Sequence, residues 1–348
     1  MSESVEIHGN RYKISEDGYL DLAEIDIESI EDIKDFQNLE NVKELDLSYN
    51  HISNMKGLGD IRSLEHLDLS NNDIHEIDRL EHLKSQGSLF SLDLHSNLIS
   101  EIKGLQSLCH LRNLDLSHNE IREISGLENL QCLEYLDLSH NQIHKIEGFQ
   151  NLKSLEFLDL SNNVINELNG PNLSKSLKIL SLSQNKIKFI TDLGNLEKLE
   201  SLDLAGNEIT RIQGLDSLCN LDCLFLYKNN IEELSGLHTL KFLDVLDLDK
   251  NQIEEIKGLE NLVHLKELSL ADNKIKEIKG INHIQSLESL NMQNNEINEI
   301  KGLENLNSLK CVDLTGNKIN EIVGIELNNA KALVNYCRRR KKYKKSLK

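Results

Sequence analysis

Histidines, cysteines and aspartates are the side chains with which this sequence of 348 residues could do chemistry. Among its thirteen histidines, His66 and His95 are predicted to lie beside Asp68 and Asp93, and imidazoles with carboxylates can bind zinc. These ligands converge less tightly than those of a closed zinc site, so we expect no metal and no cofactor. The sequence also lacks the motifs GxxxxGK[ST], GxGxxG, GxSxG and HExxH, and we therefore predict that the protein is not an enzyme.

The six cysteines do not suggest a redox or metal site. They are Cys109, Cys132, Cys219, Cys223, Cys311 and Cys337, and no two of them form a CxxC pair. Residues 1–15 have no apolar core behind a basic end, so we expect no secretory signal. Both observations favour reduced thiols and a location in the cytoplasm or the nucleus.

The elements that must position these side chains are repeats. Thirteen asparagines recur at intervals of 22 residues, with a single interval of 25; they are Asn50, Asn72, Asn97, Asn119, Asn141, Asn163, Asn185, Asn207, Asn229, Asn251, Asn273, Asn295 and Asn317. One clean copy of the frame is Leu111-x-x-Leu114-x-Leu116-x-x-Asn119-x-Ile121. The period-two spacing of Leu114 and Leu116 predicts a strand with both leucines inward, and the buried asparagine can satisfy backbone groups of adjacent turns. Eleven of the eighteen glycines share one phase of the repeat, which indicates a positive φ or a close approach.

This frame resembles the leucine-rich repeat of the 22-residue class, which includes the nuclear regulatory subunit of type 1 protein phosphatase and the internalin ectodomains. The resemblance covers about residues 20–327. It implies an α/β-type solenoid, a curved array of about 13–14 repeats. A parallel sheet is expected on the concave face, with 3-10, short helical or extended segments on the convex face.

The two ends are predicted to cap this array. Residues 1–19 form the N-terminal cap, in which Val5 to Ile14 and Tyr19 to Leu22 look like two short strands joined by a turn. Residues 20–327 form the solenoid, with irregular return segments near Lys84, Ser85 and Gln86 and at Pro171. Residues 328–348 form a capping helix with a basic tail. Ala330, Leu333, Val334 and Cys337 lie on one face of that helix, and Asn328 or Asn329 starts it.

Aspartates recur at the strand position that faces outward between the paired leucines. Nine of the thirteen repeats have one there: Asp46, Asp68, Asp93, Asp115, Asp137, Asp159, Asp203, Asp247 and Asp313. This column is either a habit of the repeat that keeps the surface soluble or an acidic track for a basic partner. The aspartates that we assign to a partner-binding surface are Asp115, Asp137, Asp159, Asp203 and Asp247.

Aromatic and apolar side chains interrupt the polar pattern of the same face. Tyr135, Phe157 and Ile179 take the first outward position of three successive repeats, and Phe225, Tyr227 and Val245 take outward positions further along, beside Cys223 and Lys228. Exposed aromatics next to charges are typical of interface hot spots. We predict that these six residues bind a partner on the concave face.

The charge of the chain is divided between an acidic body and a basic tail. The net charge is −19, and residues 331–348 carry nine bases and no acid. Residues 1–330 therefore carry 30 bases against 58 acids, a net charge of −28, which favours basic partners. The tail bases that we single out are Arg338, Arg339, Arg340, Lys341, Lys342, Lys344 and Lys345. They are a solvated helix end, a segment folded back on the body, or a site for anionic membrane or nucleic acid.

These patterns predict a monomeric, non-enzymatic protein–protein interaction scaffold or regulatory subunit. Its partner would be a protein with a basic surface, and the family resemblance suggests a phosphatase catalytic subunit. The alternative is a recruitment module that binds anionic membrane or nucleic acid through the basic tail.

Overall fold

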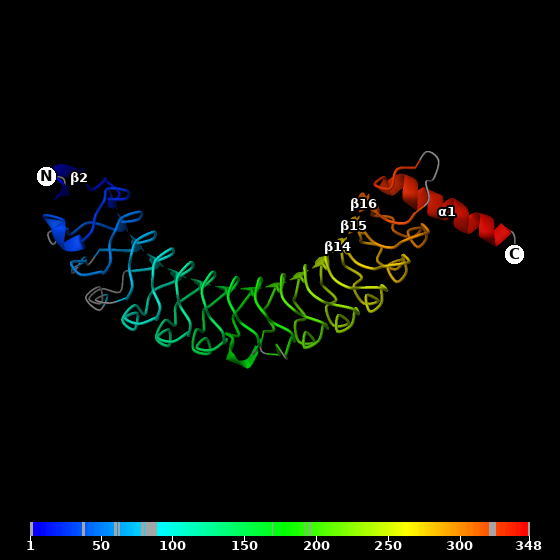
Figure 1. The fold of residues 1–348 in the computed structure, drawn as a ribbon, viewed down its shortest axis with the longest axis horizontal. Coiled ribbons are helices and arrows are strands. Elements are labelled where there is room, and N and C mark those ends of the chain that lie inside the picture. Colours follow the sequence, from blue (N-terminus) through cyan, green and yellow to red (C-terminus); the bar gives the residue numbers. More distant parts are fainter. Residues whose placement is uncertain are drawn as a thin grey trace. The chain divides into compact units, whose positions relative to one another are not determined.

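The computed structural model describes residues 3–36, 39–58, 61, 63–77, 80, 89–168, 170–191, 193–194, 196–319 and 325–346. The chain forms two compact units, residues 1–165 with 172–177 and residues 166–171 with 178–348. Each unit is a stack of turns, of 22 residues in most cases and of 25 in two cases in the first unit, with one short strand per turn. Within each unit the strands lie on the inner, concave side and the return segments on the outer side (Figure 1).

The first unit contains a hairpin and seven parallel strands. The hairpin pairs β1 (Ser4–Ile7) with β2 (Asn10–Lys13). The parallel strands, in chain order and in register, are β3 (Tyr19–Asp21), β4 (Glu44–Asp46), β5 (His66–Asp68), β6 (Ser91–Asp93), β7 (Asn113–Asp115), β8 (Tyr135–Asp137) and β9 (Phe157–Asp159). A 3-10 helix, η1 (Ile30–Asp32), lies between β3 and β4.

The second unit contains seven parallel strands and the helix of the C-terminal end. The strands are β10 (Ile179–Ser181), β11 (Ser201–Asp203), β12 (Cys223–Phe225), β13 (Val245–Asp247), β14 (Glu267–Ser269), β15 (Ser289–Asn291) and β16 (Cys311–Asp313). The helix is α1 (Ala330–Ser346). A 3-10 helix, η4 (Gly170–Asn172), includes Pro171. The fourteen parallel strands confirm the predicted solenoid, and the return segment at Pro171 is the 3-10 helix η4. The predicted irregularity at Lys84 to Gln86 lies outside the described residues.

The register stacks leucine on leucine and builds one core per unit. Leu114 pairs with Leu136 on the next strand, and both are fully buried, as is Leu116. On the outer side, successive turns close the return segment: the Leu130 N–H donates to the Leu127 carbonyl and the Leu133 N–H to the Leu130 carbonyl. A single repeat could not bury these leucines alone, so stability comes from stacking on neighbours.

The asparagine of each repeat connects the backbones of adjacent turns. The side-chain nitrogen of Asn119 donates to the carbonyls of Leu94, Leu116 and Ser117 at 3.0, 3.1 and 3.1 Å. Its oxygen accepts the backbone N–H of Ile99, one repeat earlier, at 3.0 Å. This confirms that the asparagine is present to satisfy buried backbone groups.

The recurrent glycine is required by both conformation and space. At Gly126 φ is +75°, and a Cβ there would collide with the backbone carbonyl oxygen of Ile102 in the preceding repeat. Only glycine meets both conditions without strain.

The N-terminal cap differs in detail from the two strands that we predicted. Residues Ser4 to Lys13 form a complete hairpin that turns at His8 and Gly9, both with positive φ. Tyr19–Asp21 is instead the first strand of the parallel sheet, because its register continues into β4. The hairpin attaches through reciprocal backbone hydrogen bonds between Glu6 and Lys34, at 3.1 and 3.2 Å.

The C-terminal helix packs on the array as predicted. Ala330, Leu333, Val334 and Cys337 are all buried, which confirms the apolar face. The Asn329 side chain accepts the Ala332 N–H at 3.0 Å, so Asn329 is the residue that caps the helix start.

Candidate functional site

The outward-facing residues of the parallel strands, together with the residue two positions after the end of each strand, form what we call the sheet face. The nine aspartates of this face are all partly buried. Each accepts a hydrogen bond from the backbone N–H two residues later, for example Asp115 from Ser117 at 2.8 Å and Asp313 from Thr315 at 2.8 Å. The aspartate thus closes a local turn at the end of its strand. Neither interpretation of the aspartate column in the sequence included this structural role.

The aspartate column is nevertheless a run of neighbouring charges. In the first unit, the strand register places Asp93 next to Asp115, Asp115 next to Asp137 and Asp137 next to Asp159. In the second unit, burial raises the pKa of Asp247, and the charges of Asp249 and Asp203 add to that shift, while a hydrogen bond from the Asp249 backbone opposes it. The sheet face therefore carries carboxylates whose charge a cation would stabilise.

Tyr135 and Phe157 form an aromatic pair on the sheet face of the first unit. Their rings are stacked with centroids 4.4 Å apart and an angle of 7° between the planes. Burial raises the pKa of Tyr135 to about 12, with further contributions from Asp137, Asp115 and Asp159. Its hydroxyl lies 3.5 Å from Asp137 Oδ2, to which it can donate. The pair is thus an ordered apolar platform bordered by three carboxylates.

Phe225, Tyr227 and Val245 lie together on the sheet face of the second unit. Phe225 on β12 lies in register between Asp203 on β11 and Asp247 on β13, and Val245 is the register partner of Cys223. Tyr227 is fixed by Lys250, whose Nζ donates to the phenol oxygen at 2.8 Å and lies 5.1 Å from the ring centroid. Ile179 on β10 is 42% exposed. The positions of the aromatic residues are predictable from the sequence, whereas the lysine that holds Tyr227 is not.

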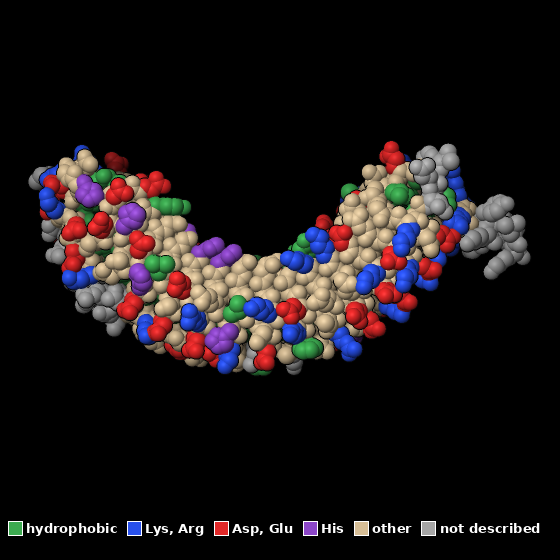
Figure 2. Space-filling view, viewed as in Figure 1, with side chains coloured by type: hydrophobic (Ala, Val, Ile, Leu, Met, Phe, Trp, Pro, Cys, Tyr) green, Lys and Arg blue, Asp and Glu red, His purple; other side chains and the backbone are tan. Residues whose placement is uncertain are grey.

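Histidines form a further feature of the first unit, on its inner edge (Figure 2). His118 and His140 stack with ring centroids 4.0 Å apart. Burial lowers the pKa of His118, and the nearby His140 and His95 act in the same direction. His118 and His140 both have positive φ, and each comes directly before the recurrent asparagine of its repeat. His66, which we grouped with His95, Asp68 and Asp93 from the sequence, is exposed on β5, and the carboxylate that approaches His95 from the next strand is Asp115.

The basic tail is partly engaged by the acidic body. Arg340 forms an ion pair with Glu299 at 2.5 Å, and Lys341 forms one with Glu304 at 2.9 Å. Arg338 donates to the Glu304 carbonyl at 3.0 Å and to Asn307 at 2.5 Å. Three of the seven selected bases therefore hold α1 on the last turns. Arg339 and Lys342 are exposed, and the side chains of Lys344 and Lys345 lie outside the described residues.

In the described part of the chain, no helix has the length and apolar character needed to cross a membrane.

One short strand per 22-residue turn, a buried asparagine ladder and an outward row of variable side chains together define a solenoid repeat protein. A family model described as "Leucine Rich repeats (2 copies)" matches residues 88–129, 133–174, 175–218, 242–283 and 263–305, and a second leucine-rich repeat model matches residues 19–74. The chain belongs to the leucine-rich repeat family. No curated protein matches the sequence significantly.

Solved structures support the same family. The chain is 28% identical to an internalin, InlF, from Listeria monocytogenes, with a TM-score of 0.73 and 87% of each chain covered. It is 29% identical to a leucine-rich repeat protein of Leptospira interrogans, with a TM-score of 0.73, covering 80% of this chain and 74% of that one. It is also 25% identical to a chain of the LRIM1/APL1C complex, with a TM-score of 0.64, covering 74% of this chain and 48% of that one.

Proposed function

We propose that this protein is a non-enzymatic interaction scaffold that binds a partner protein through the sheet face. Leucine-rich repeat proteins generally act as interaction scaffolds, and one similar structure is itself a complex of two proteins, LRIM1 and APL1C. The observation that carries the proposal is the stacked pair of Tyr135 and Phe157 within the aspartate column of the first unit.

The aromatic pair is suited to act as an anchor because it is ordered before a partner binds. A stacked ring loses little further rotamer freedom on binding, so more of the burial free energy is retained as affinity. Truncation of such an anchor typically costs about 2 kcal/mol or more, which is roughly 30-fold in Kd. In the second unit, Phe225 and the Lys250-supported Tyr227 offer a second anchor of the same kind.

The aspartates would select the charge of the partner. Asp115, Asp137 and Asp159 border the aromatic pair, and Asp203 and Asp247 flank Phe225. A basic surface would be attracted by these carboxylates, chiefly through its association rate, and the attraction would weaken with added salt. A role as a regulatory subunit, and a phosphatase as the partner, remain narrower predictions of the same proposal.

The alternative of recruitment through the tail receives less support. Arg338, Arg340 and Lys341 would have to give up their contacts with Glu299, Glu304 and Asn307 before they could bind phosphate groups. That competition would weaken any membrane or nucleic-acid binding by this segment.

The experiment compares capture of partner proteins from native cell extract by three forms of the full chain. These are the wild type, the double variant Tyr135→Ala/Phe157→Ala, and the control Phe189→Ala, whose 59% exposed ring lies outside the strands. We expect a specific set of proteins to be retained by the wild type and the control and lost by the double variant. Retained proteins should also elute with salt. Equal recovery by a folded double variant would reject this site.

A further inference from the structure

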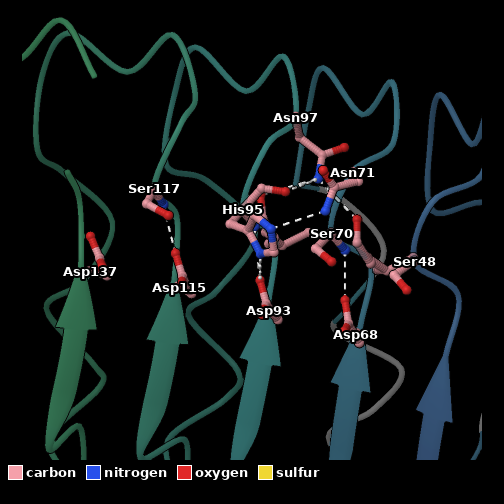
Figure 3. A network of polar contacts seen from close by, with 12 residues as sticks. Ser48, Asp68, Ser70, Asn71, Asp93, His95, Asn97, Asp115, Ser117 and Asp137 are labelled. Atoms are coloured by element: carbon pink, nitrogen blue, oxygen red, sulfur yellow. Dashed lines mark hydrogen bonds and ion pairs between the residues drawn. The ribbon is translucent and has the colours of Figure 1, made fainter. Parts of the chain in front are cut away.

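Asp93, His95 and Asp115 converge on the sheet face of the first unit. Each residue offers one possible ligand atom, and these three atoms lie within 4.8 Å of one another. Figure 3 shows His95 directly above Asp93 at the end of β6, with Asp115 at the end of the adjacent strand β7. All three residues are only partly buried, so the group opens toward solvent.

The imidazole of His95 is an addition to what the repeat needs. The backbone N–H of His95 donates to Asp93 Oδ1 at 2.9 Å, and the backbone N–H of Ser117 makes the equivalent hydrogen bond to Asp115. In the repeat that contains β4, Asp46 Oδ1 accepts a second hydrogen bond, from the hydroxyl of Ser48, at 2.6 Å. At His95 the ring nitrogen Nδ1 takes that place, 2.9 Å from Asp93 Oδ1. A serine would therefore satisfy the fold, whereas the histidine adds a nitrogen ligand.

The ring is also oriented from its other side. Asn71 Nδ2 lies 3.0 Å from His95 Nε2, so in the present hydrogen-bond pattern Asn71 donates to Nε2 and Nδ1–H donates to Asp93. When Nδ1 becomes a ligand, the proton moves to Nε2, and a rotated Asn71 amide can accept it through its oxygen. A polar partner on the second ring nitrogen is what fixes the tautomer of a metal-bound histidine.

We propose that Asp93, His95 and Asp115 bind a divalent first-row transition-metal ion such as Zn²⁺ or Co²⁺. A tetrahedral ion with bonds of about 2.0–2.1 Å holds its ligand atoms roughly 3.4 Å apart. His95 Nδ1 and Asp93 Oδ1 are already closer than this, at 2.9 Å, and a carboxylate oxygen of Asp115 lies within 4.8 Å of both ligand atoms. The imidazole favours Zn²⁺ or Co²⁺ over Mg²⁺ and Ca²⁺, which prefer oxygen ligands alone.

The charge of the surrounding column supports a cation here. Strand register places Asp68 beside Asp93 and Asp137 beside Asp115, so four carboxylates lie on consecutive strands around His95. A bound ion would offset their mutual repulsion. Three protein ligands leave at least one coordination position open on the sheet face, where water or another ligand can complete the site.

The test is a titration of the full, tag-free chain with Co²⁺, followed by visible absorbance and by competition with Zn²⁺. We expect one Co²⁺ per chain, displaced by Zn²⁺ but not by Mg²⁺ or Ca²⁺. His95→Ser should abolish this binding and still fold, because it restores the serine found two repeats away at Ser48 and next door at Ser70 and Ser117. The matched control is His110→Ser, an exposed histidine whose equivalent in later repeats is Ser154 or Ser176. It should bind Co²⁺ as the wild type does.

Two further variants separate ligation from folding. Asp115→Asn keeps an oxygen that can accept the Ser117 N–H, as Asn291 does for Gln293 at 3.2 Å, but removes the charged ligand, so binding should weaken. Asn71 has positive φ, and glycine stands at the equivalent position of a later repeat, at Gly206. Asn71→Gly removes the partner of the second ring nitrogen and should weaken binding by about 10–100-fold. Absence of Co²⁺ binding by the wild type would overturn the proposal. So would equal binding by His95→Ser, or a thiolate-to-cobalt band indicating cysteine ligands.

Discussion

Replacement of Asn119 by alanine tests the asparagine ladder in the first unit, where this side chain is buried. The side chain is 8% exposed and makes four hydrogen bonds, but their loss would not have equal consequences. The Leu94 carbonyl would keep a donor from Asn97, the Leu116 carbonyl one from Asn141, and the Ser117 carbonyl one from the Ser96 N–H. The Ile99 N–H, in contrast, would lose the partner that it has in the structure.

The expected loss of stability follows from which of these backbone groups keep a hydrogen-bond partner. A buried N–H left without a partner costs about 1–3 kcal/mol, and weakening three shared bonds adds a smaller amount. We therefore expect Asn119→Ala to lower the free energy of unfolding by about 2–4 kcal/mol. The matched control is Asn317→Ala in the last repeat, where the equivalent side chain is more exposed and water can replace it, so a loss of about 1 kcal/mol is expected.

Urea unfolding followed by far-ultraviolet circular dichroism measures both variants. The m-value is compared with that of the wild type, because an altered m-value would mean that the stack no longer unfolds as one cooperative unit. A loss below about 1 kcal/mol for Asn119→Ala, or an equal loss for Asn317→Ala, would contradict the assignment of the ladder to buried backbone groups.

Three other predictions follow from single contacts. Gly126→Ala should destabilise the chain more than Gly9→Ala in thermal unfolding, because both have positive φ but only the first would push a Cβ into a backbone carbonyl; equal shifts in Tm would contradict this. The pKa of Tyr135 is raised to about 12 by burial and nearby aspartates, so its stabilising effect is complete below about pH 10 and is lost as the pH rises through about 12. Tyr135→Phe should therefore reduce the fall in stability over that range, as seen in urea unfolding at several alkaline pH values, and an unchanged profile would count against the shift. Arg340→Ala removes the ion pair with Glu299 and should speed hydrogen exchange in α1 but not in the strands, whereas unchanged exchange would mean that the pair does not hold the helix.

The periodic part of the fold was accessible from the sequence because each of its causes is local to the repeat. Leu114, Leu116 and Asn119 have to point inward wherever the frame recurs, so their spacing predicts the strand, the core and the ladder together. The helix at the C-terminal end was predictable for the same reason, since Leu333 and Cys337 mark one face by their spacing alone.

Contacts between different repeats were harder to predict. The pairing of Arg340 with Glu299 depends on which turn α1 packs against, and no spacing within the helix contains that information. The same holds for Lys250 and Tyr227, which are 23 residues apart and meet only because the solenoid stacks them. The approach of Asp115 to His95 likewise depends on strand register, and from the sequence we grouped His95 with His66, Asp68 and Asp93 but not with Asp115.

The turn made by the aspartates shows that the fold requires their side-chain oxygen, whereas their negative charge serves the sheet face. Asn291 accepts the N–H two residues later, as the nine aspartates do, so the turn needs a side-chain oxygen but not a negative charge. The charge brings a cost, because carboxylates on strands about 4.8 Å apart repel by about 3 kcal/mol at an effective dielectric of 20 and by less than about 1 kcal/mol in water. A basic partner or a bound cation would relieve that repulsion, and the relief would add to its binding free energy. The structural role of Asp115 and its charge are therefore separable by the Asp115→Asn substitution, which leaves the turn acceptor in place while removing the attraction for cations.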